Sequence, residues 1–283
     1  MEWIPYPVKE HIRIHEIFTF FTYHYENEYE FPGETHNFWE CVYVLDGSLC
    51  VSADERVYNL SKDEIIFHKP LELHKFRITS QGGATLLIFS YSMSGSLCKY
   101  FNNKVFALDK KQCAIISDIL EYATLHEDKT AHVLNRYMSA TETVKLYSQT
   151  IALNLCRLLL SLAENSNIIP IYESPDSIIF TNTVKFMTDN ICTNLSAEDF
   201  ARNASISTSS LKRIFNRYAG MGIHKYFLKL RLKSAAALLS DGQSVTAVAE
   251  TLGFSSQGYF SKVFKRETGI LPSEYSESSS YIL

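Results

Sequence analysis

A repeated pattern between residues 207 and 275 constrains the fold more than any other feature of this sequence. Residues recur at a fixed offset of 49 positions, and a fixed offset marks an internal repeat. In each copy the apolar residues fall at i, i+3 and i+4, a serine precedes them and a glycine follows, which predicts two equivalent capped helices. The pairs are Ser207/Ser256, Leu211/Phe260, Ile214/Val263, Phe215/Phe264, Arg217/Arg266, Gly220/Gly269 and Tyr226/Tyr275.

A shorter helix is expected before each of these two helices. Val245, Val248, Ala249 and Leu252 follow a helical spacing before the second copy, and Gly253 then breaks it. Residues 200–204 form a shorter apolar face before the first copy, opened by Ser196 and Asp199 in a variant of the capping box. A short helix, a tight turn and a second helix make a helix-turn-helix motif, whose second helix enters the DNA major groove.

The outward faces of the two recognition helices carry hydroxyl, amide and cationic groups but no acid. Arg and Lys bond guanine edges and phosphates, Asn bonds adenine, and Ser bonds either. The alternative is a solvated polar face of a helical bundle, which would normally mix both signs of charge. The outward residues are Ser209, Lys212, Arg213 and Asn216 in the first helix, and Gly258, Ser261, Lys262 and Lys265 in the second.

The run AVAETLGFSSQGYFSKVFKRETGILPSEY, from Ala247 to Tyr275, resembles the signature of the AraC/XylS family of bacterial transcription regulators. The upstream runs LSAEDFARNASISTSSLKRIFNRYAG and RLKSAAALL fit the same domain. The resemblance implies two helix-turn-helix units that are joined by one long helix, expected at His224–Ser240, and that read adjacent major-groove segments. By position, the implied base-reading residues are Ser209, Ser210, Lys212 and Arg213, then Ser256, Gln257, Ser261 and Lys262. Family members often carry a larger side chain where Gly258 stands, so the second helix is expected to read fewer bases.

The length of 283 residues suits two domains, and the charge is unevenly divided between them. From residue 180 onward there are seven Lys and five Arg against eight acidic residues, although the whole chain has a net charge of −4. We therefore predict a sensing and dimerisation domain at 1–164, a linker at 165–178 with Pro170 and Pro175, and a DNA-binding domain at 179–283. The predicted fold class is two-domain α+β.

The six cysteines show no C-x-x-C pair and no disulfide-dense spacing, which is typical of reduced thiols in a cytosolic protein. No signal-peptide pattern stands at the N-terminus. The sequence also shows no apolar run near the ~18 residues that span a membrane. A cytoplasmic location away from membranes is therefore expected.

Residues 11–91 are predicted to form several short strands, as in an all-β barrel or sandwich. Asp46-Gly47 is a strong turn signal between two of them. The predicted strands are Ile17 to Tyr25, Glu40 to Leu45, Leu49 to Ser52, Arg56 to Asn59, Ile65 to His68 and Ala84 to Tyr91.

The segments HNFWECVYVLDGSL and DEIIFHKPLELHKF are similar to the cupin-like sensor domain common in this family, which encloses a small ligand. Glu34, His36, Glu40 and His74 stand where cupins have metal ligands, with Glu34 replacing a usual histidine. Three interpretations remain open: a metal site, polar handles for an organic ligand at His36, Glu40 and His74, and purely structural side chains. We expect no cofactor and no metal.

Aromatic residues on the candidate strands are expected to line the ligand pocket, because such sites are mostly apolar with a few placed polar groups. Most aromatic side chains in a small barrel simply fill its core, which is the alternative for each of them. The candidates are Phe38, Trp39 and Tyr43, and Phe20, Tyr23 and Phe67 lie nearby on the predicted strands.

The segment Ser139–Asn165 is predicted to be a long helix that is apolar on more than one side. One side can pack on the barrel and another on a second subunit, and similar helices mediate dimerisation in this family. We expect Leu155 and Leu158 at the dimer surface. The alternative is that neighbouring helices of the same chain cover every apolar side.

Together these features predict a ligand-responsive, sequence-specific transcription regulator, more often an activator in this family, that acts as a homodimer. The implied partners are double-stranded DNA, a small-molecule effector and RNA polymerase. One alternative is a cupin metalloenzyme fused to a DNA-binding module, and another is an architectural DNA binder that needs no ligand. We predict that the chain is not an enzyme.

Overall fold

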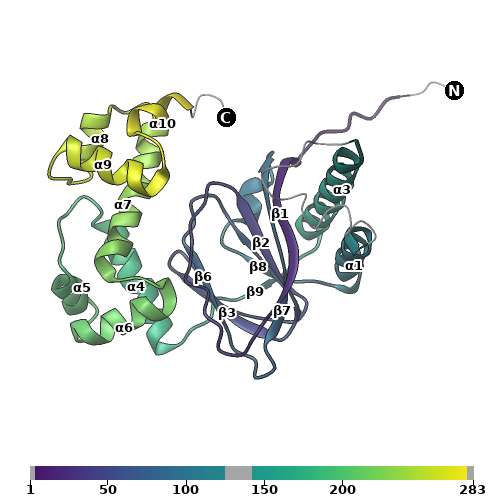
Figure 1. Ribbon diagram of the computed structural model, residues 1–283, viewed down its shortest axis with the longest axis horizontal. Helices are drawn as coiled ribbons and strands as arrows, with labels where there is room; N and C mark the ends of the chain where they lie inside the picture. Colours follow the sequence, from purple (N-terminus) through teal and green to yellow (C-terminus); the bar gives the residue numbers. More distant parts are fainter. Residues whose placement is uncertain (1–3, 125–141, 279–283) are drawn as a thin grey trace. The chain divides into compact units, whose positions relative to one another are not determined.

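A computed structural model describes residues 4–124 and 142–278 (Figure 1). The chain divides into two compact units, Met1–Tyr172 and Glu173–Leu283. The division falls within the segment predicted as a linker. The N-terminal unit is rich in β-strands and the C-terminal unit is helical. The two-domain α+β class expected from the sequence is confirmed.

Two antiparallel sheets form the body of the N-terminal unit. The six-stranded sheet has the order β1-β7-β2-β5-β8-β9, and the three-stranded sheet has the order β4-β3-β6. The strands are β1 (Arg13–Tyr25), β2 (Trp39–Asp46), β3 (Ser48–Ala53), β4 (Arg56–Ser61), β5 (Glu64–His68), β6 (His74–Ile78), β7 (Ala84–Ser94), β8 (Val105–Ala107) and β9 (Asn167–Ile169).

The alternation of side chains along the strands creates two separate apolar cores, one on each face of the large sheet. On β2, Val42 and Val44 face the small sheet and join a core with Leu49 and Phe76. The intervening residues of β2 face the helices and join a second core. The small sheet, the large sheet and a helical layer therefore stack in that order.

Helices α1 (Lys110–Thr124) and α3 (Glu142–Glu164) form this helical layer; they pack against each other, and α3 also packs against β1 (Figure 1). Leu155 and Leu158 are almost fully buried in the core between α3 and the sheet. The expectation that they lie at a dimer surface is therefore wrong, because they lie on the side of α3 that covers the sheet. The exposed leucines of this helix are Leu146, Leu153 and Leu160.

One stretch of α3, Leu146–Glu164, is long and apolar enough to pass a length-and-composition test for a membrane-spanning helix, with a mean hydropathy of 1.2. The expectation that no stretch of the sequence is long and apolar enough to span a membrane is therefore wrong on this test. A buried core helix passes the same test, and the face of α3 that includes Ile151 and Leu162 is buried against the sheet.

The predicted linker at 165–178 contains regular structure. Asn167–Ile169 forms β9, which pairs with β8 at the edge of the large sheet. Helix α4 (Pro175–Asp189) begins earlier than the expected position near Phe180. Ser174 caps it in a capping box with Ser177, and Pro175 suits the first turn because it needs no amide donor there.

The C-terminal unit consists of α4 and six further helices among the described residues. The predicted joining helix at His224–Ser240 is observed as α7, one residue longer at its start. The first motif comprises α5 and α6, and the second comprises α8 and α9. The bounds are α5 (Ala197–Asn203), α6 (Thr208–Ala219), α7 (Ile223–Ser240), α8 (Val245–Thr251), α9 (Gln257–Thr268) and α10 (Pro272–Ser278).

Candidate functional site

The two recognition helices, α6 and α9, are built on the same frame. Ser207 and Ser256 cap their N-termini, each accepting a hydrogen bond from the amide three residues on. Gly220 and Gly269 end them in the left-handed conformation, with φ of 65° and 85°, which costs glycine nothing because it has no Cβ. The apolar face of each helix is buried, so the opposite face must point away from the core. The repeat seen in the sequence is a structural repeat.

The turn before α9 leaves no room for a side chain. Gly253 has φ of 68°, and a Cβ there would lie 2.6 Å from the carbonyl oxygen of Cys192. The turn before α6 instead uses Ser205 at φ of 55°. The two motifs therefore reach the same helix–turn–helix path with different turn residues.

The cations on the outward faces are free of partners within the described chain. Lys212, Arg213, Lys262 and Lys265 are exposed and form no ion pair with any described residue. Such cations are available to phosphates or base edges. Of the other predicted DNA-contacting residues, Ser209, Asn216, Ser256 and Gln257 are exposed, and Ser210 and Ser261 are half-buried.

Several of the predicted serine and amide contacts already have partners inside the protein. The Ser256 hydroxyl accepts a hydrogen bond from the Tyr259 backbone amide. The Ser210 hydroxyl accepts one from the Ser207 hydroxyl. The Gln257 side-chain oxygen accepts a hydrogen bond from the Thr246 hydroxyl at 2.9 Å, which ties α9 to α8. These side chains are held in place before any DNA arrives.

Sequence reasoning missed Tyr259, which stands in α9 where α6 has Ser210. Its side chain is 49% exposed, and its ring lies 6.3 Å from that of Phe254. A signal was present, because an aromatic residue outside the i, i+3, i+4 apolar face cannot be filling the core. An exposed aromatic ring on a recognition helix adds apolar contact area that the first helix lacks.

Sequence reasoning also missed the buried Arg231 of α7. Its guanidinium donates hydrogen bonds to the carbonyl oxygens of Ile191 and Thr193 and lies over the Phe227 ring, 4.5 Å from its centroid. Burial lowers the pKa of Arg231, although an arginine stays charged in proteins. The contact joins α7 to the loop after α4, next to the close approach of Gly253 to Cys192. Arg231 therefore positions the first motif against the joining helix.

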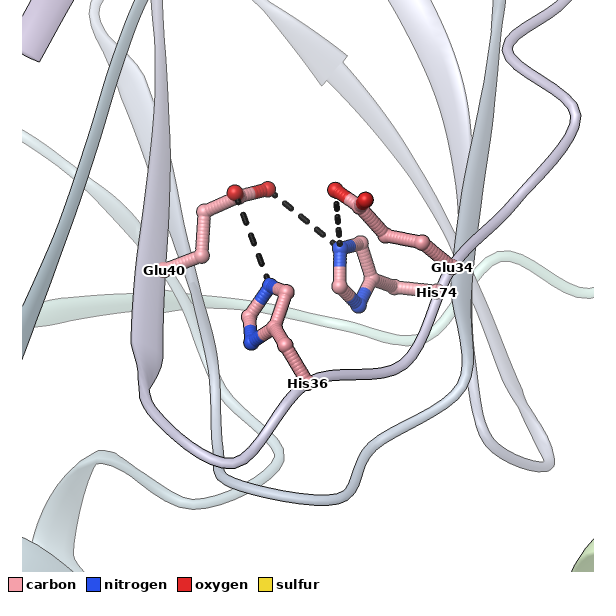
Figure 2. Close-up of side chains that lie close together, drawn as sticks. All are labelled: Glu34, His36, Glu40 and His74. Carbon is pink, nitrogen blue, oxygen red and sulfur yellow. Dashed lines mark ion pairs between the residues drawn. The ribbon is translucent and has the colours of Figure 1, made fainter. Parts of the chain in front are cut away.

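The N-terminal unit brings four of the predicted site residues together (Figure 2). Glu34 and His36 come from the connection between β1 and β2, Glu40 lies on β2, and His74 begins β6. A backbone bridge between Glu34 and His74 aligns the connection with β6. The nitrogen and oxygen atoms that these side chains offer all lie within 4.8 Å of one another.

The contacts inside this cluster are longer than ordinary hydrogen bonds. His74 Nε2 lies 3.3 Å from Glu40 Oε1 and 3.7 Å from Glu34 Oε1, and His36 Nε2 lies 3.6 Å from Glu40 Oε2 (Figure 2). Both Nε2 atoms are buried and have no hydrogen-bond partner. The other ring nitrogen of each histidine lies near a backbone carbonyl, Phe38 O at 3.0 Å and Glu72 O at 3.1 Å.

The carboxylates change the protonation of the cluster. Burial alone would lower the pKa of His74, but Glu34 and Glu40 outweigh it and raise that pKa to about 10. Burial alone would raise the pKa of Glu40, but His36 and His74 hold it well below its usual range. Without another cation, the carboxylates therefore draw a proton to His74.

A buried polar network supports His74 from behind. The His68 ring stacks on the His74 ring, 4.2 Å between centroids, and its Nδ1 bonds the Glu72 carboxylate at 2.8 Å. Lys69 pairs with both Glu72 and Asp54. Burial is the largest influence on the His68 pKa and lowers it, so His68 stays neutral at neutral pH.

Two of the predicted ligand-binding aromatics do not face this cluster. Trp39 and Tyr43 lie on β2 at odd spacing from Glu40, so the pleat turns them to the opposite face. There they are buried in the core beneath the helices, and the Tyr43 hydroxyl donates to Asp63. Their assignment to the same pocket as Glu40 is therefore wrong. Phe38 does adjoin the cluster, because its ring stacks on His36 at 3.9 Å.

A second concave feature is a groove of about 580 Å³ between β1 and α3. Its walls are mainly apolar, with His15 and Gln149 among the polar groups. Phe20, one of the aromatics noted in the sequence, lines this groove and not the four-residue cluster. The apolar lining residues are Ile14, Ile17, Phe18, Phe20, Tyr147 and Ile151.

Comparison with known proteins gives matches in both units. The model of the AraC-like ligand binding domain matches residues 19–125, and that of a helix-turn-helix domain matches residues 200–278. An uncharacterized HTH-type transcriptional regulator of Haemophilus influenzae is 40% identical over 84 residues, and the HTH-type transcriptional activator RhaR of Mannheimia succiniciproducens is 41% identical over 78. These matches cover 29% and 27% of this chain but only 28% of each relative's own length.

Solved structures of similar proteins include an AraC-type regulator from Chromobacterium violaceum and ToxT from Vibrio cholerae O395. The first is 31% identical over 38% of this chain and 97% of its own, with a TM-score of 0.37. The second is 16% identical over 94% and 96%, with a TM-score of 0.38. On the matched sensor and helix-turn-helix domains, the chain belongs to the AraC/XylS family of transcription regulators.

Proposed function

We propose that the protein is a ligand-responsive transcription activator that binds specific double-stranded DNA through α6 and α9. The observation that carries this proposal is the pair of capped helices with exposed cations that have no partner among the described residues. Among the proposed DNA-contacting residues, Arg213 is the strongest candidate for reading a base, because its planar guanidinium can donate two hydrogen bonds to one guanine. The proposal places the protein in the cytoplasm, with RNA polymerase as its partner, and assigns it no catalytic activity.

The proposed effector is a small molecule bound by the N-terminal unit. His36, Glu40 and His74 offer the polar groups, and the Phe38 ring, which stacks on His36, adds apolar surface beside them. Ligand sites commonly combine apolar walls with a few placed polar groups. Binding there would act on the connection between β1 and β2, which carries Glu34 and His36.

The proposed homodimer uses the exposed leucines of α3. Leu146, Leu153 and Leu160 are 63%, 64% and 41% exposed and recur every seven residues. A seven-residue spacing keeps side chains on nearly one face of a helix, as in a helix pair. Leu153→Glu with Leu160→Glu is expected to give a folded monomer in light scattering. An unchanged dimer would place the interface elsewhere.

Selection from random duplexes with the full chain tests the DNA proposal. Two helices on one face of DNA are expected to enrich two short blocks about 10–10.5 base pairs apart. Arg213→Ala is then compared with the wild type on the enriched site and on a scrambled duplex, by fluorescence anisotropy. Failure to enrich any sequence, with equal affinity for all duplexes, would contradict specific recognition.

A further inference from the structure

We propose that Glu34, His36, Glu40 and His74 bind a divalent transition-metal ion that clamps the two sheets of the N-terminal unit. This inference replaces the expectation from the sequence that the unit holds no metal. It concerns side chains that the proposed function gives to the effector, but it does not require DNA binding. Metal binding is measured without DNA, so the two proposals can fail separately.

The spacing of the donor atoms fits a metal shell better than a hydrogen-bonded ion pair. Zinc bonds of about 2.0–2.1 Å place tetrahedral ligand atoms roughly 3.3–3.4 Å apart. The contacts of Glu40 with His74 and His36 measure 3.3 and 3.6 Å, and that of Glu34 with His74 measures 3.7 Å. All four donors lie within 4.8 Å of one another, so closing the wider pairs onto one ion needs side-chain movements of about 1–1.5 Å at most.

The tautomer of each histidine also fits a metal ligand. A backbone carbonyl only accepts, so Nδ1 of His36 must donate to Phe38 O and Nδ1 of His74 must donate to Glu72 O. With a cation bound in place of the proton that His74 otherwise holds, the lone pair lies on Nε2, the atom that points at the carboxylates (Figure 2). Carbonyl bonds of this kind fix the orientation of metal-binding histidines.

Nε2 of His74 is buried and lacks an ordinary hydrogen-bond partner. The side chain is only 2% exposed, and Nε2 has no hydrogen bond although the Glu40 and Glu34 carboxylates lie 3.3 and 3.7 Å away. A buried polar atom without a partner costs about 1–3 kcal/mol, so such an atom calls for an explanation. A metal ion between Nε2 and the two carboxylates would satisfy all of them at once.

The elements that carry the four donors indicate what an ion would do. Glu40 belongs to β2 of the large sheet, and His74 belongs to β6 of the small sheet. Glu34 and His36 belong to the connection that pairs with β6 at the Glu34–His74 bridge. One ion would therefore join both sheets and fix the connection between β1 and β2, so occupancy can control the proposed effector site.

The donor set selects the class of ion. Imidazole nitrogen suits zinc, iron, copper and nickel, while calcium and magnesium prefer oxygen ligands alone. No thiol joins the cluster: Cys41, adjacent to Glu40, is turned to the opposite face of β2 and buried among the helix-facing residues. A mixed shell of two imidazoles and two carboxylates therefore fits a divalent first-row transition ion, and Zn²⁺ is the first probe.

The test uses the full chain, stripped with a chelator and titrated with Zn²⁺ by calorimetry. Wild type is expected to bind about one ion per chain and to gain thermal stability, because a ligand that binds only the folded state stabilises it. His36→Gln and Glu40→Gln are expected to lose this site. Glu34→Gln is expected to weaken it less, because the Glu34 side chain is 47% exposed and water can replace it.

His15→Gln serves as the matched control, since His15 is an exposed histidine outside the cluster that bonds Ser94. The control is expected to bind Zn²⁺ as the wild type does. Absence of stoichiometric binding by the wild type would overturn the proposal. Equal binding by wild type, His36→Gln and Glu40→Gln would also overturn it, because other groups would then hold the ion.

X-ray absorption spectroscopy of the wild-type protein with bound Zn²⁺ identifies the ligand atoms directly, so it tests the proposal even if a variant fails to fold. The proposal requires two imidazoles with nitrogen at about 2.0–2.1 Å and oxygen at about 2.0–2.2 Å. A sulfur shell at about 2.3 Å would assign the ion to cysteines instead and overturn the proposal.

Discussion

The two recognition helices have the same scaffold and different surfaces. Both are twelve-residue helices with a serine cap and a left-handed glycine, and both bury their apolar face. The scaffold residues therefore serve folding, whereas the outward residues differ between the two helices. Position by position, α6 has Ser209, Ser210, Lys212, Arg213 and Asn216 where α9 has Gly258, Tyr259, Ser261, Lys262 and Lys265.

The substitutions separate two kinds of DNA contact. The α6 surface ends in an arginine and an amide, whose planar groups can bond base edges in pairs. The α9 surface has two lysines, which act as point charges, and a glycine that offers no side chain. We therefore expect α6 to supply more of the sequence discrimination and α9 more of the attraction to the phosphate backbone.

The largest expected effect tests whether the two scaffolds are energetically equivalent. Phe215 and Phe264 occupy matching positions and are both fully buried. Truncating either to alanine is expected to cost about 3–5 kcal/mol in the free energy of unfolding of the C-terminal unit. Urea denaturation of the full chain, followed by helical circular dichroism, measures the loss. Tyr259→Ala, at an exposed position, is the control, and a much smaller loss at one phenylalanine would break the equivalence.

Arg231 tests how strongly the two motifs depend on their joining helix. Arg231→Met removes the donors to the carbonyls of Ile191 and Thr193, at a cost of about 1.5–3 kcal/mol, because the lost hydrogen bonds come from a charged group. Binding to the specific site requires both recognition helices at one spacing. The variant should therefore lose more affinity for that site than for a DNA duplex that carries only the base pairs contacted by α6. Lys225→Met, at an exposed position on the same helix, is the control. Equal losses on both sites would mean that Arg231 only stabilises the fold.

The sequence predicted local structure in the C-terminal unit well, because caps and apolar spacing act within a single helix. It missed β6, β8 and β9, whose pairing partners lie far away along the chain: β9 pairs with β8 across more than fifty residues. A three-residue strand has too few residues to show a period. Arg231 was missed because its partners are backbone carbonyls, which no side-chain pattern reveals.

The candidate site was predicted in part. The positions of Glu34, His36, Glu40 and His74 were singled out from the sequence, and the structure brings them together. Trp39 and Tyr43 were added because they are aromatic neighbours, although strand alternation alone would have separated them from Glu40. The sequence could not tell which leucines of α3 face the sheet, because that helix is apolar on several sides.

Arg213 and Lys262 occupy matching positions and test which recognition helix discriminates between bases. Arg213→Ala is expected to cost on the order of 1–3 kcal/mol on the specific site and to relax preference at one base position. Lys262→Ala is expected to cost less, because a point charge makes no paired contact with a base. Anisotropy on single-base variants of the site measures both. A larger loss of discrimination for Lys262→Ala would reverse the assignment.

Asn216 and Lys265 occupy matching positions in α6 and α9. Substituting them is expected to change DNA affinity least, and the salt dependence of binding tells the two residues apart. Lys265→Ala removes a phosphate-directed charge, so it should weaken binding to specific and scrambled DNA alike and flatten the salt dependence by about one unit. Asn216→Ala removes no charge, so the slope of log affinity against log salt should stay unchanged while preference on the specific site falls. Salt titrations of both variants on both duplexes separate the two contacts. If Lys265→Ala lost affinity only on the specific site, α9 would read bases at this position and the division of work between the helices would not hold.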